Sequence, residues 1–289
     1  MRVFPAALLP LSLGGCPLAP TLTGNGVPGE RHEALPDVQV VVAAGALQVD
    51  VQPSPKAAAR VRCDENLLPS IRLDVDGGRL VIHTAGPAGG AVQLAPQAGP
   101  CTVWVGLPAL HAVSNTGSGD LRVGGEALDA PETGPLTRAA EAADGGGAAS
   151  DGWDTLAAAT LTGSGALWLA GSSSPEALTL TLTGSGDLFA DAVAAKHLEA
   201  TLTGSGDLWV EGGRAATIDA RLSGSGDLDL RAAAAPAATL RLTGSGDLSA
   251  TVSDTVEVTL SGSGDVRVWG DPRQRARSRT GSGKIRFEQ

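Results

Sequence analysis

The residues in this sequence that could do chemistry are acidic side chains that recur at one position of a repeat. The triplet Gly-Ser-Gly begins at residues 117, 163, 184, 204, 224, 244, 262 and 281, and aspartate follows six of these eight triplets. The aspartates are Asp120, Asp187, Asp207, Asp227, Asp247 and Asp265. Carboxylates that stack one per turn repel one another unless amide groups, water or cations offset their charge. A row of calcium ions is therefore one function to weigh.

Two observations favour a structural corner over a metal site at these aspartates. The calcium-binding nonapeptide repeat has a shorter period and a GGxGxD consensus, whereas the consensus here is GSGD. Glycine lets the chain turn sharply, and serine or aspartate can bond a nearby free amide. We therefore expect no metal and no cofactor. In the alternative, a cation-stabilised protein, the ligands would be Asp187, Asp207, Asp227 and Asp247.

Catalysis is the rival function, because parallel β-helices also carry polysaccharide lyases and hydrolases that use acids and bases on an outer face. A repeat explains one aspartate per turn without any reaction. No acid, base and Arg or Lys depart together from the consensus, and the four histidines are scattered at positions 32, 83, 111 and 197. The sequence thus favours a protein that is not an enzyme and has no catalytic residues.

Aromatic side chains form a second candidate site. Trp168, Phe189 and Trp209 occupy equivalent positions in three consecutive repeats. Pointing outward, they could present stacked rings to a surface glycan or a partner protein, because an exposed row of this kind can mark a binding strip. In the alternative, the rings only cover one another or lie beneath a loop.

The elements that must position these residues follow from the repeat. From residue 163 onward the Gly-Ser-Gly triplets are 18 to 21 residues apart, and apolar residues alternate on both sides of each triplet. Alternation with period two predicts strands, with Leu198, Ala200 and Leu202 inward before the corner and Leu208 and Val210 inward after it. One such repeat cannot bury its apolar face alone, so it must stack on its neighbours. We predict an all-β parallel β-helix, a solenoid with turns of about 20 residues and GSGD corners.

Equivalent apolar positions should form two internal ladders. The first comprises Leu167, Leu188, Leu208, Leu228, Leu248, Val266 and Ile285. The second comprises Leu161, Leu182, Leu202, Leu222, Leu242 and Leu260. In the last repeat Arg275, Arg277 and Arg279 stand where earlier repeats carry inward aliphatic residues. A polar cap over the end of the solenoid explains them, with an anion-binding patch as the alternative.

The amino terminus predicts export. Met1-Arg2, an apolar run from Val3 to Leu13 and Leu13-Gly14-Gly15-Cys16 resemble a bacterial lipoprotein signal, with residues 1–15 as signal peptide and Cys16 as the lipidated residue. An ordinary cleaved signal is the alternative. Residue 17, directly after the cysteine, is proline. An aspartate there would resemble an inner-membrane retention signal, so the proline favours the outer membrane. We expect a protein anchored by lipid to the bacterial envelope, followed by a flexible tether over residues 16–34.

The net charge and the cysteines limit which partners and which compartment the protein can have. A net charge of -10 and a pI near 4.8 exclude general nucleic-acid binding, which needs a cationic face. Cys63 and Cys101 remain once Cys16 carries lipid, and they can form a disulfide in an oxidising compartment or can be buried as small apolar residues. The expected partners are the membrane, a surface glycan or protein, and further copies of the chain.

Residues 35–289 resemble the head GIN domain family (DUF2807, putative autotransporter adhesin), found in bacterial secreted proteins and lipoproteins. The GSGD corners carry the resemblance together with Asp64-Glu65-Asn66-Leu67-Leu68-Pro69, Asp76-Gly77-Gly78-Arg79-Leu80-Val81-Ile82, Gly270-Asp271-Pro272 and Gly281-Ser282-Gly283-Lys284. Ala166 replaces one corner aspartate, and a Pro-, Gly- and Ala-rich stretch near 129–152 departs from the pattern as an inserted loop. The resemblance implies a β-helix outside the cytoplasm and supplies no catalytic residues.

Taken together, these observations predict a non-enzymatic envelope lipoprotein that acts as an adhesin or surface scaffold. The alternatives are a β-helix protein that binds or degrades polysaccharide, and an adhesin stabilised by cations.

Overall fold

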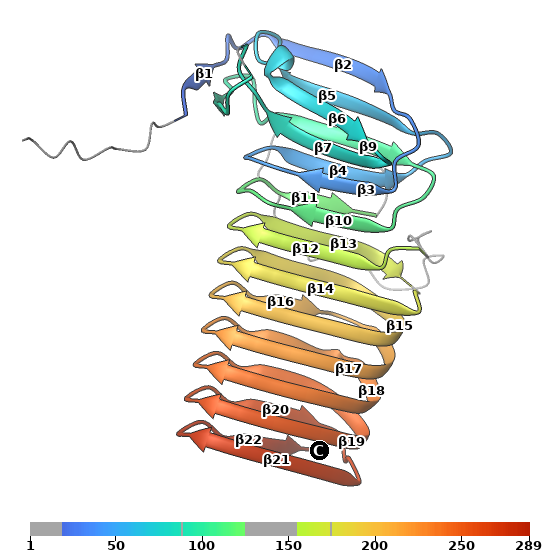
Figure 1. Ribbon diagram of the computed structural model, residues 1–289, viewed down its shortest axis with the longest axis vertical. Helices are drawn as coiled ribbons and strands as arrows, with labels where there is room; N and C mark the ends of the chain where they lie inside the picture. Colours follow the sequence, from blue (N-terminus) through green and yellow to red (C-terminus); the bar gives the residue numbers. More distant parts are fainter. Residues whose placement is uncertain (1–18, 88, 125–154, 174) are drawn as a thin grey trace, which may run out of the picture.

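The computed structural model describes residues 19–87, 89–124, 155–173 and 175–289 (Figure 1). The signal peptide and lipid anchor predicted at residues 1–16, and the insert predicted near 129–152, lie outside the described residues. No described helix is long and apolar enough to cross a membrane.

Apart from one short 3₁₀ turn, all regular secondary structure of the described chain is β-strand. The strands are β1 (Thr21–Thr23), β2 (Pro28–Ala34), β3 (Val40–Ala43), β4 (Gln48–Pro53), β5 (Ala58–Asp64), β6 (Ile71–Asp76), β7 (Arg79–Thr84), β8 (Gln93–Ala95), β9 (Thr102–Leu107), β10 (Ala112–Asn115), β11 (Leu121–Val123), β12 (Ala158–Gly163), β13 (Ala166–Ser173), β14 (Ala177–Gly184), β15 (Asp187–Gly204), β16 (Leu208–Val210), β17 (Gly213–Gly224), β18 (Leu228–Gly244), β19 (Leu248–Gly262), β20 (Val266–Trp269), β21 (Gln274–Gly281) and β22 (Ile285–Glu288). A short 3₁₀ turn, η1 (Leu68–Ser70), precedes β6.

Two stacks of parallel strands run along the molecule and enclose the core. The first sheet follows the order β7, β3, β10, β12, β14, β15, β17, β18, β19 and β21. The second follows β9, β4, β11, β13, β15, β16, β18, β19, β20 and β22. The long strands β15, β18 and β19 bend from the second sheet into the first. Each coil is therefore a first-sheet strand, a Gly-Ser-Gly corner and a second-sheet strand, and the coils stack into the rod of Figure 1.

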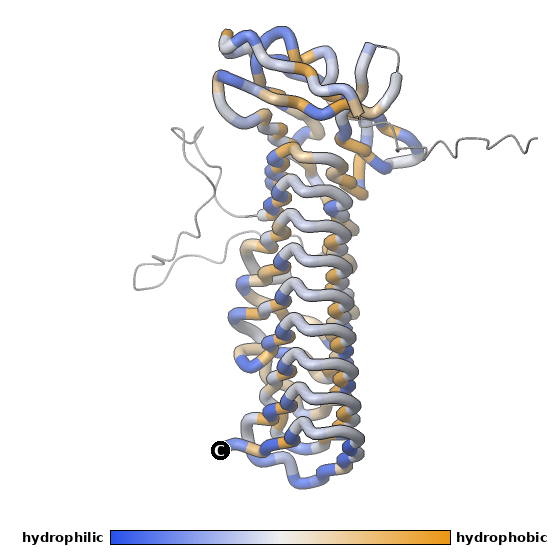
Figure 2. The backbone as a smooth tube through the Cα atoms, turned by 90° about the vertical axis from the view of Figure 1, so that its left-hand side faces the viewer, coloured by the Kyte–Doolittle hydropathy of each residue, from blue (hydrophilic) through white to orange (hydrophobic). Residues whose placement is uncertain are grey.

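The predicted ladders are confirmed by the strand register. Leu167, Leu188 and Leu208 are consecutive partners in the second sheet, and the series continues through Leu228, Leu248, Val266 and Ile285. The first-sheet series runs from Leu161 through Leu182, Leu202, Leu222 and Leu242 to Leu260. All of these residues except the terminal Ile285 are buried. Figure 2 shows the same sequence of polar and apolar residues repeating from coil to coil.

The corners need glycine because equivalent backbones stack directly on one another. Gly224 has φ +142°, and a Cβ there would lie 2.0 Å from the carbonyl oxygen of Gly204. At the third corner residue, Gly226, a Cβ would lie 1.8 Å from the oxygen of Gly206. A side chain at either position would therefore separate neighbouring coils, which explains why the motif carries two glycines.

The amino-terminal end departs from the regular solenoid. β5 pairs antiparallel with both β2 and β9, and β6 pairs antiparallel with β7 around Gly77 and Gly78. β1 and β8 form a separate small parallel sheet. The prediction of a parallel β-helix is thus confirmed for the repeats, while this antiparallel end (Figure 1) was not predicted.

The predicted tether over residues 16–34 is wrong for the part that the structure describes. β2 pairs with all seven residues of β5, from Pro28 opposite Asp64 to Ala34 opposite Ala58. The Arg31 guanidinium donates to the carbonyl oxygens of Leu68 and Ile71, each at 2.9 Å. Backbone pairing and one arginine hold this segment in place of buried apolar side chains. Its sequence therefore did not need the apolar alternation from which strands are predicted.

Candidate functional site

The predicted aromatic row is present on the outer side of the second sheet. Trp168, Phe189 and Trp209 are register partners in three consecutive coils, and all three side chains are half-buried. The ring centroids of Trp168 and Phe189 are 5.8 Å apart with planes at 7°, and those of Phe189 and Trp209 are 4.7 Å apart at 15°. The Arg122 guanidinium lies over the Trp168 ring, 5.3 Å from its centroid. Neighbours thus cover Phe189 and Trp168 on both faces, whereas no ring or cation of the described residues lies over the far face of Trp209.

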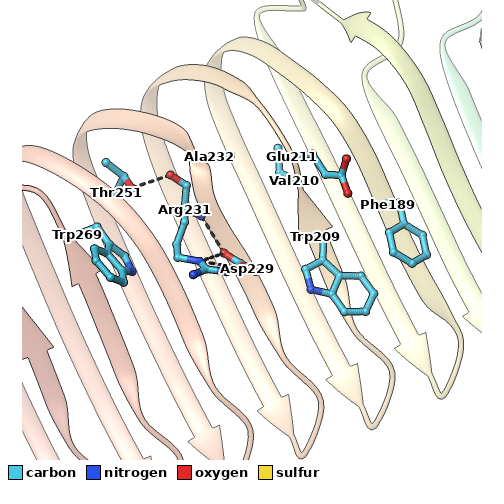
Figure 3. Close-up of a pocket in the computed structure, with 9 residues that line it drawn as sticks. All are labelled: Phe189, Trp209, Val210, Glu211, Asp229, Arg231, Ala232, Thr251 and Trp269. Atoms are coloured by element: carbon cyan, nitrogen blue, oxygen red, sulfur yellow. Dashed lines mark hydrogen bonds and ion pairs between the residues drawn. The ribbon is translucent and has the colours of Figure 1, made fainter. Parts of the chain in front are cut away.

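A groove of about 1000 Å³ begins at that face of Trp209. The row continues from Trp209 to Asp229 and Ser249, whose short side chains leave room above the sheet. Trp269, from β20, lines the groove together with Trp209. In Figure 3 the two indoles lie on opposite sides of the Asp229 and Arg231 pair. The complete lining is Phe189, Trp209, Val210, Glu211, Asp229, Arg231, Ala232, Thr251 and Trp269.

A bidentate ion pair lies between the two tryptophans. The Arg231 Nε donates to both carboxylate oxygens of Asp229 at 2.9 Å, and its Nη2 donates to Oδ2. The carboxylate raises the pKa of the Arg231 guanidinium through this hydrogen bond and its charge. Arg231 is 55% exposed and Asp229 22% exposed, so both groups also face the groove. The groove therefore offers indole surface, a fixed cation and a fixed anion within one site.

A change in coil length produces this groove. The register between β18 and β19 shifts after Leu230, which pairs with Ala250, because Ala234 pairs with the next residue, Thr251. Residues 231–233 are thus extra on the β18 side. The hydroxyl of Thr251 donates to the Arg231 carbonyl oxygen at 2.6 Å and fixes this bulge. Arg231 is consequently displaced from the strand ladder into the groove.

The corner aspartates hold successive coils together. Asp187 Oδ1 accepts the backbone N–H of Asp207 at 3.1 Å, and Asp207 Oδ1 accepts that of Asp227 at 2.7 Å. The pattern continues through Asp247 and Asp265 to the N–H of Lys284. Where Ala166 lacks a carboxylate, the Asp187 N–H bonds the Gly165 carbonyl at 3.3 Å instead. Among the described residues, no group of three or more His, Cys, Asp or Glu side chains is arranged to hold a metal ion.

Cys63 and Cys101, for which the sequence left a disulfide and simple burial open, are joined by a disulfide. Their Cα atoms are 4.4 Å apart and both side chains are buried. The bond ties the end of β5 to the residue before β9.

The Asp64-Glu65-Asn66 segment of the family motif clasps the chain around residue 25. Asp64 is buried and accepts the backbone N–H groups of Gly26, Gln97 and Ala98. Burial raises the pKa of the Asp64 carboxyl, but these three amides outweigh that effect and hold it below its ordinary value. Asn66 bonds the Asn25 amide and the Thr23 carbonyl, so the motif has a structural role here.

Sequence reasoning placed the aromatic row correctly but missed the groove beside it. Asp229 follows Phe189 and Trp209 at the same repeat position, and this change from ring to carboxylate was a usable signal. Trp269 gave a weaker signal, since its ladder partner is the non-aromatic Thr251. Arg231 gave none, because only the register shift brings it to the site.

Comparison with known proteins identifies the family. The family described as "Putative auto-transporter adhesin, head GIN domain" (DUF2807) matches residues 38–133 and 153–272, so the chain belongs to it. The membership indicates an adhesin-like surface or extracytoplasmic protein. A search of the curated proteins finds no match to the sequence.

Solved structures share the fold over nearly the whole chain. A "putative adhesin" from Parabacteroides merdae is 17% identical with a TM-score of 0.75, covering 94% of this chain and 100% of its own. A "putative lipid binding protein" from Parabacteroides distasonis is 21% identical with a TM-score of 0.76, covering 93% and 99%. A "putative adhesin" from the same species is 18% identical with a TM-score of 0.74, covering 93% and 100%. At these identities the likeness establishes the fold alone.

Proposed function

We propose that this protein is a non-enzymatic adhesin of the bacterial envelope that binds carbohydrate in the groove between Trp209 and Trp269. The observation that carries the proposal is the uncovered face of Trp209 at the end of a rigid ring stack, opening into a groove of about 1000 Å³. An indole face packs well against the apolar side of a sugar ring, and fixed polar groups beside it orient the hydroxyls.

The polar groups of the groove fit this role. Asp229 and Arg231 hold each other through two guanidinium nitrogens, so their remaining hydrogen-bonding capacity is presented in fixed directions. A ligand that donates and accepts hydrogen bonds, as a glycan does, suits such a pair. The ring stack orders Trp209 in advance, which reduces the entropy lost on binding.

The same geometry favours binding over turnover. A hydrolase of the acid and base type uses two carboxyl groups that flank the scissile bond, one of which keeps a raised pKa. Asp229 instead forms a bidentate ion pair with Arg231, and the corner aspartates accept backbone amides. A cation-stabilised adhesin likewise gains no support at the corners, since each Oδ1 in the Asp187–Asp265 series already has an N–H donor.

Anchoring belongs to the same proposal. Lipid attached at Cys16 would hold the amino-terminal end at the membrane, and the described amino-terminal strands lie at the opposite end of the rod from β21 and β22 (Figure 1). The solenoid would then carry the groove away from the membrane. Metabolic labelling with a palmitate analogue in a bacterial host tests the anchor: Cys16→Ser should abolish labelling, and labelling that persists in this variant would contradict it.

The binding experiment uses a soluble chain that begins after Cys16 and retains every described residue. Binding to a glycan array and to whole cells is measured for the wild type and for the Trp168→Ala, Phe189→Ala, Trp209→Ala variant. The matched control is Thr160→Ala, Thr181→Ala, Thr201→Ala, which trims a register row on the first sheet of neighbouring coils.

We expect saturable binding by the wild type and the threonine control, and its loss in the aromatic variant. Circular dichroism checks that all three proteins remain folded. Equal binding by the aromatic variant and the control would contradict the proposed site. No binding by the wild type would contradict the carbohydrate class.

A further inference from the structure

In the last two coils, cations replace three different kinds of residue. In the inward ladder of the first sheet, Val258 and Leu260 are followed by Arg277 and Arg279. In the corner ladder, Asp265 is followed by Lys284, whose backbone N–H donates to Asp265 Oδ1 at 2.9 Å. In the outward row of the second sheet, Ser249 is followed by Arg267 and Arg286. A polar end requires only solvation, whereas here all three series change to the same sign of charge.

This end is basic on an acidic protein. Residues 271–289 contain six Lys or Arg against two Asp or Glu, although the net charge of the chain is -10. All eight residues of β21 are exposed, and no described coil stacks on the far side of this strand. Figure 1 places β21 and β22 at the end of the rod away from the described amino-terminal strands.

Some of these cations serve as a structural cap. Arg275 donates to the Pro272 carbonyl oxygen at 2.9 Å, and its guanidinium lies over the Phe287 ring, 4.6 Å from the centroid. Arg279 donates to the Gly283 carbonyl oxygen at 2.9 Å. These contacts hold two guanidinium groups against the last coil, in keeping with the polar cap that the sequence predicts.

Other cations of the coil have no such role. Among the described residues, the side chains of Arg277 and Lys284 make no hydrogen bond or ion pair. Arg286 reaches Asp265 Oδ2 only at 3.5 Å. A pocket of about 500 Å³ has four cationic side chains and no carboxylate in its lining. The lining residues are Arg277, Arg279, Lys284, Ile285 and Arg286.

We propose that this pocket, the terminal basic pocket, binds a phosphate-type oxyanion. Like charges at this spacing repel one another, and a multivalent anion relieves that repulsion as it binds. Guanidinium groups match a tetrahedral oxyanion with paired N–H donors, and the lysine adds a mobile point charge. The site is separate from the aromatic groove and therefore stands or falls independently of the carbohydrate proposal.

The test compares two variants of equal charge. Arg277→Gln, Lys284→Gln removes the two unpaired cations of the pocket and leaves the capping arginines in place. Arg214→Gln, Arg241→Gln removes two exposed arginines from the middle of the solenoid, which also make no side-chain hydrogen bond or ion pair within the described part of the chain. Unfolding midpoints confirm that both proteins fold.

Two probes distinguish the source of the oxyanion. Sodium tripolyphosphate, titrated calorimetrically, represents a soluble phosphate, and vesicles of phosphatidylcholine with phosphatidylglycerol represent a lipid headgroup, against vesicles of phosphatidylcholine alone. We expect binding of at least one probe that weakens with added salt. The pocket variant should bind it at least about tenfold more weakly and the control less than about twofold.

The outcomes separate cleanly. Loss of tripolyphosphate binding in the pocket variant alone supports the site with a soluble phosphate as its ligand, and selective loss of vesicle binding supports it with a lipid headgroup. Equal weakening in both variants would show a general charge effect and overturn the proposal, as would the absence of binding to both probes. The aromatic triple variant should bind like the wild type, which keeps this test independent of the groove.

Discussion

The two ends of this molecule are stabilised in different ways. From β12 to β20, most coils repeat one set of contacts: an aliphatic ladder in each sheet, two glycines at the corner and, except at Ala166, a carboxylate that bonds the next coil. The amino-terminal end, residues 21–107, depends on contacts that each occur once there, among them the Cys63–Cys101 disulfide and the Asp64 clasp. Both ends share the second sheet, since β9, β4 and β11 pair in order.

The difference shows how a repeat tolerates change. In the solenoid, each coil contacts only its neighbours, so loss of one contact is felt locally and the rest of the stack persists. Ala166 illustrates this, because a corner without a carboxylate stands within the regular stack. At the amino-terminal end the disulfide and the Asp64 hydrogen bonds have no second copy within the described residues. We therefore expect substitutions there to release a whole segment.

The largest expected effect comes from a corner glycine. Gly224→Ala places a Cβ 2.0 Å from the Gly204 carbonyl oxygen at φ +142°, so neighbouring coils must separate. We expect a loss of more than about 4 kcal/mol in the free energy of unfolding, measured by chemical denaturation. Gly77→Ala is the matched control, with φ +55° and no atom within 4 Å of the added Cβ. It should cost about 1 kcal/mol. Equal losses would contradict the stacking explanation.

The disulfide should have the next largest effect, confined to the amino-terminal end. It closes a loop with a sequence separation of 38 residues. Cys63→Ala, Cys101→Ala should lower the free energy of unfolding by about 4 kcal/mol in the chain-entropy model. Hydrogen exchange should speed up in β5 and β9 and stay unchanged in β15–β19. The wild type with reductant serves as the control and should match the variant. Loss of protection throughout the solenoid would contradict the division into two ends.

Protonation of Asp64 should release the chain around residue 25. Because the folded-state pKa of this carboxyl is lowered, its contribution is complete above the ordinary value of 3.8 and is lost as the pH falls through the folded pKa. Pepsin should therefore cleave the chain within residues 21–27 faster as the pH falls from 3.8 through the folded-state pKa. Asp64→Asn should expose the segment already at neutral pH, to a neutral protease, whereas Asp76→Asn should not. An unchanged cleavage rate in the Asp64 variant would contradict the clasp.

The smallest effect should come from a corner carboxylate. Asp227→Ala removes the acceptor of the Asp247 N–H, now 2.9 Å away. One such bond contributes about 1 kcal/mol, so hydrogen exchange at the Asp247 amide should accelerate severalfold while distant coils keep their rates. Calcium or a chelator should leave the wild-type melting temperature unchanged. A melting temperature that falls with chelator would instead support the cation-stabilised alternative.

Much of the solenoid was predictable because the residues that make its stabilising contacts recur at regular spacing in the sequence. Leu202, Leu222 and Leu242 are buried partners in the structure, as their spacing predicts. The corner also followed from glycine and aspartate chemistry, although the bond from Asp207 Oδ1 to the next coil did not, since it depends on coil stacking. Arg277 was predicted at an inward position of the last coil and pairs with Val258.

The rest depended on tertiary contacts that leave little trace in the sequence. β2 is held by backbone pairing and Arg31, so its polar residues resemble a tether. Arg231 enters the groove only because β18 has extra residues relative to β19. Periodicity describes what is shared between coils, whereas both of these features arise where neighbouring segments differ.

The central claim is that the open face of Trp209 is the binding surface. Affinity for a glycan identified on the array should therefore be measured for Trp209→Ala and Trp168→Ala separately, by titration calorimetry. We predict that Trp209→Ala abolishes binding, because it removes the ring face at the groove. Trp168→Ala should weaken binding only a few-fold, through a less ordered stack. Equal losses in the two variants, or undiminished binding by Trp209→Ala, would contradict the account.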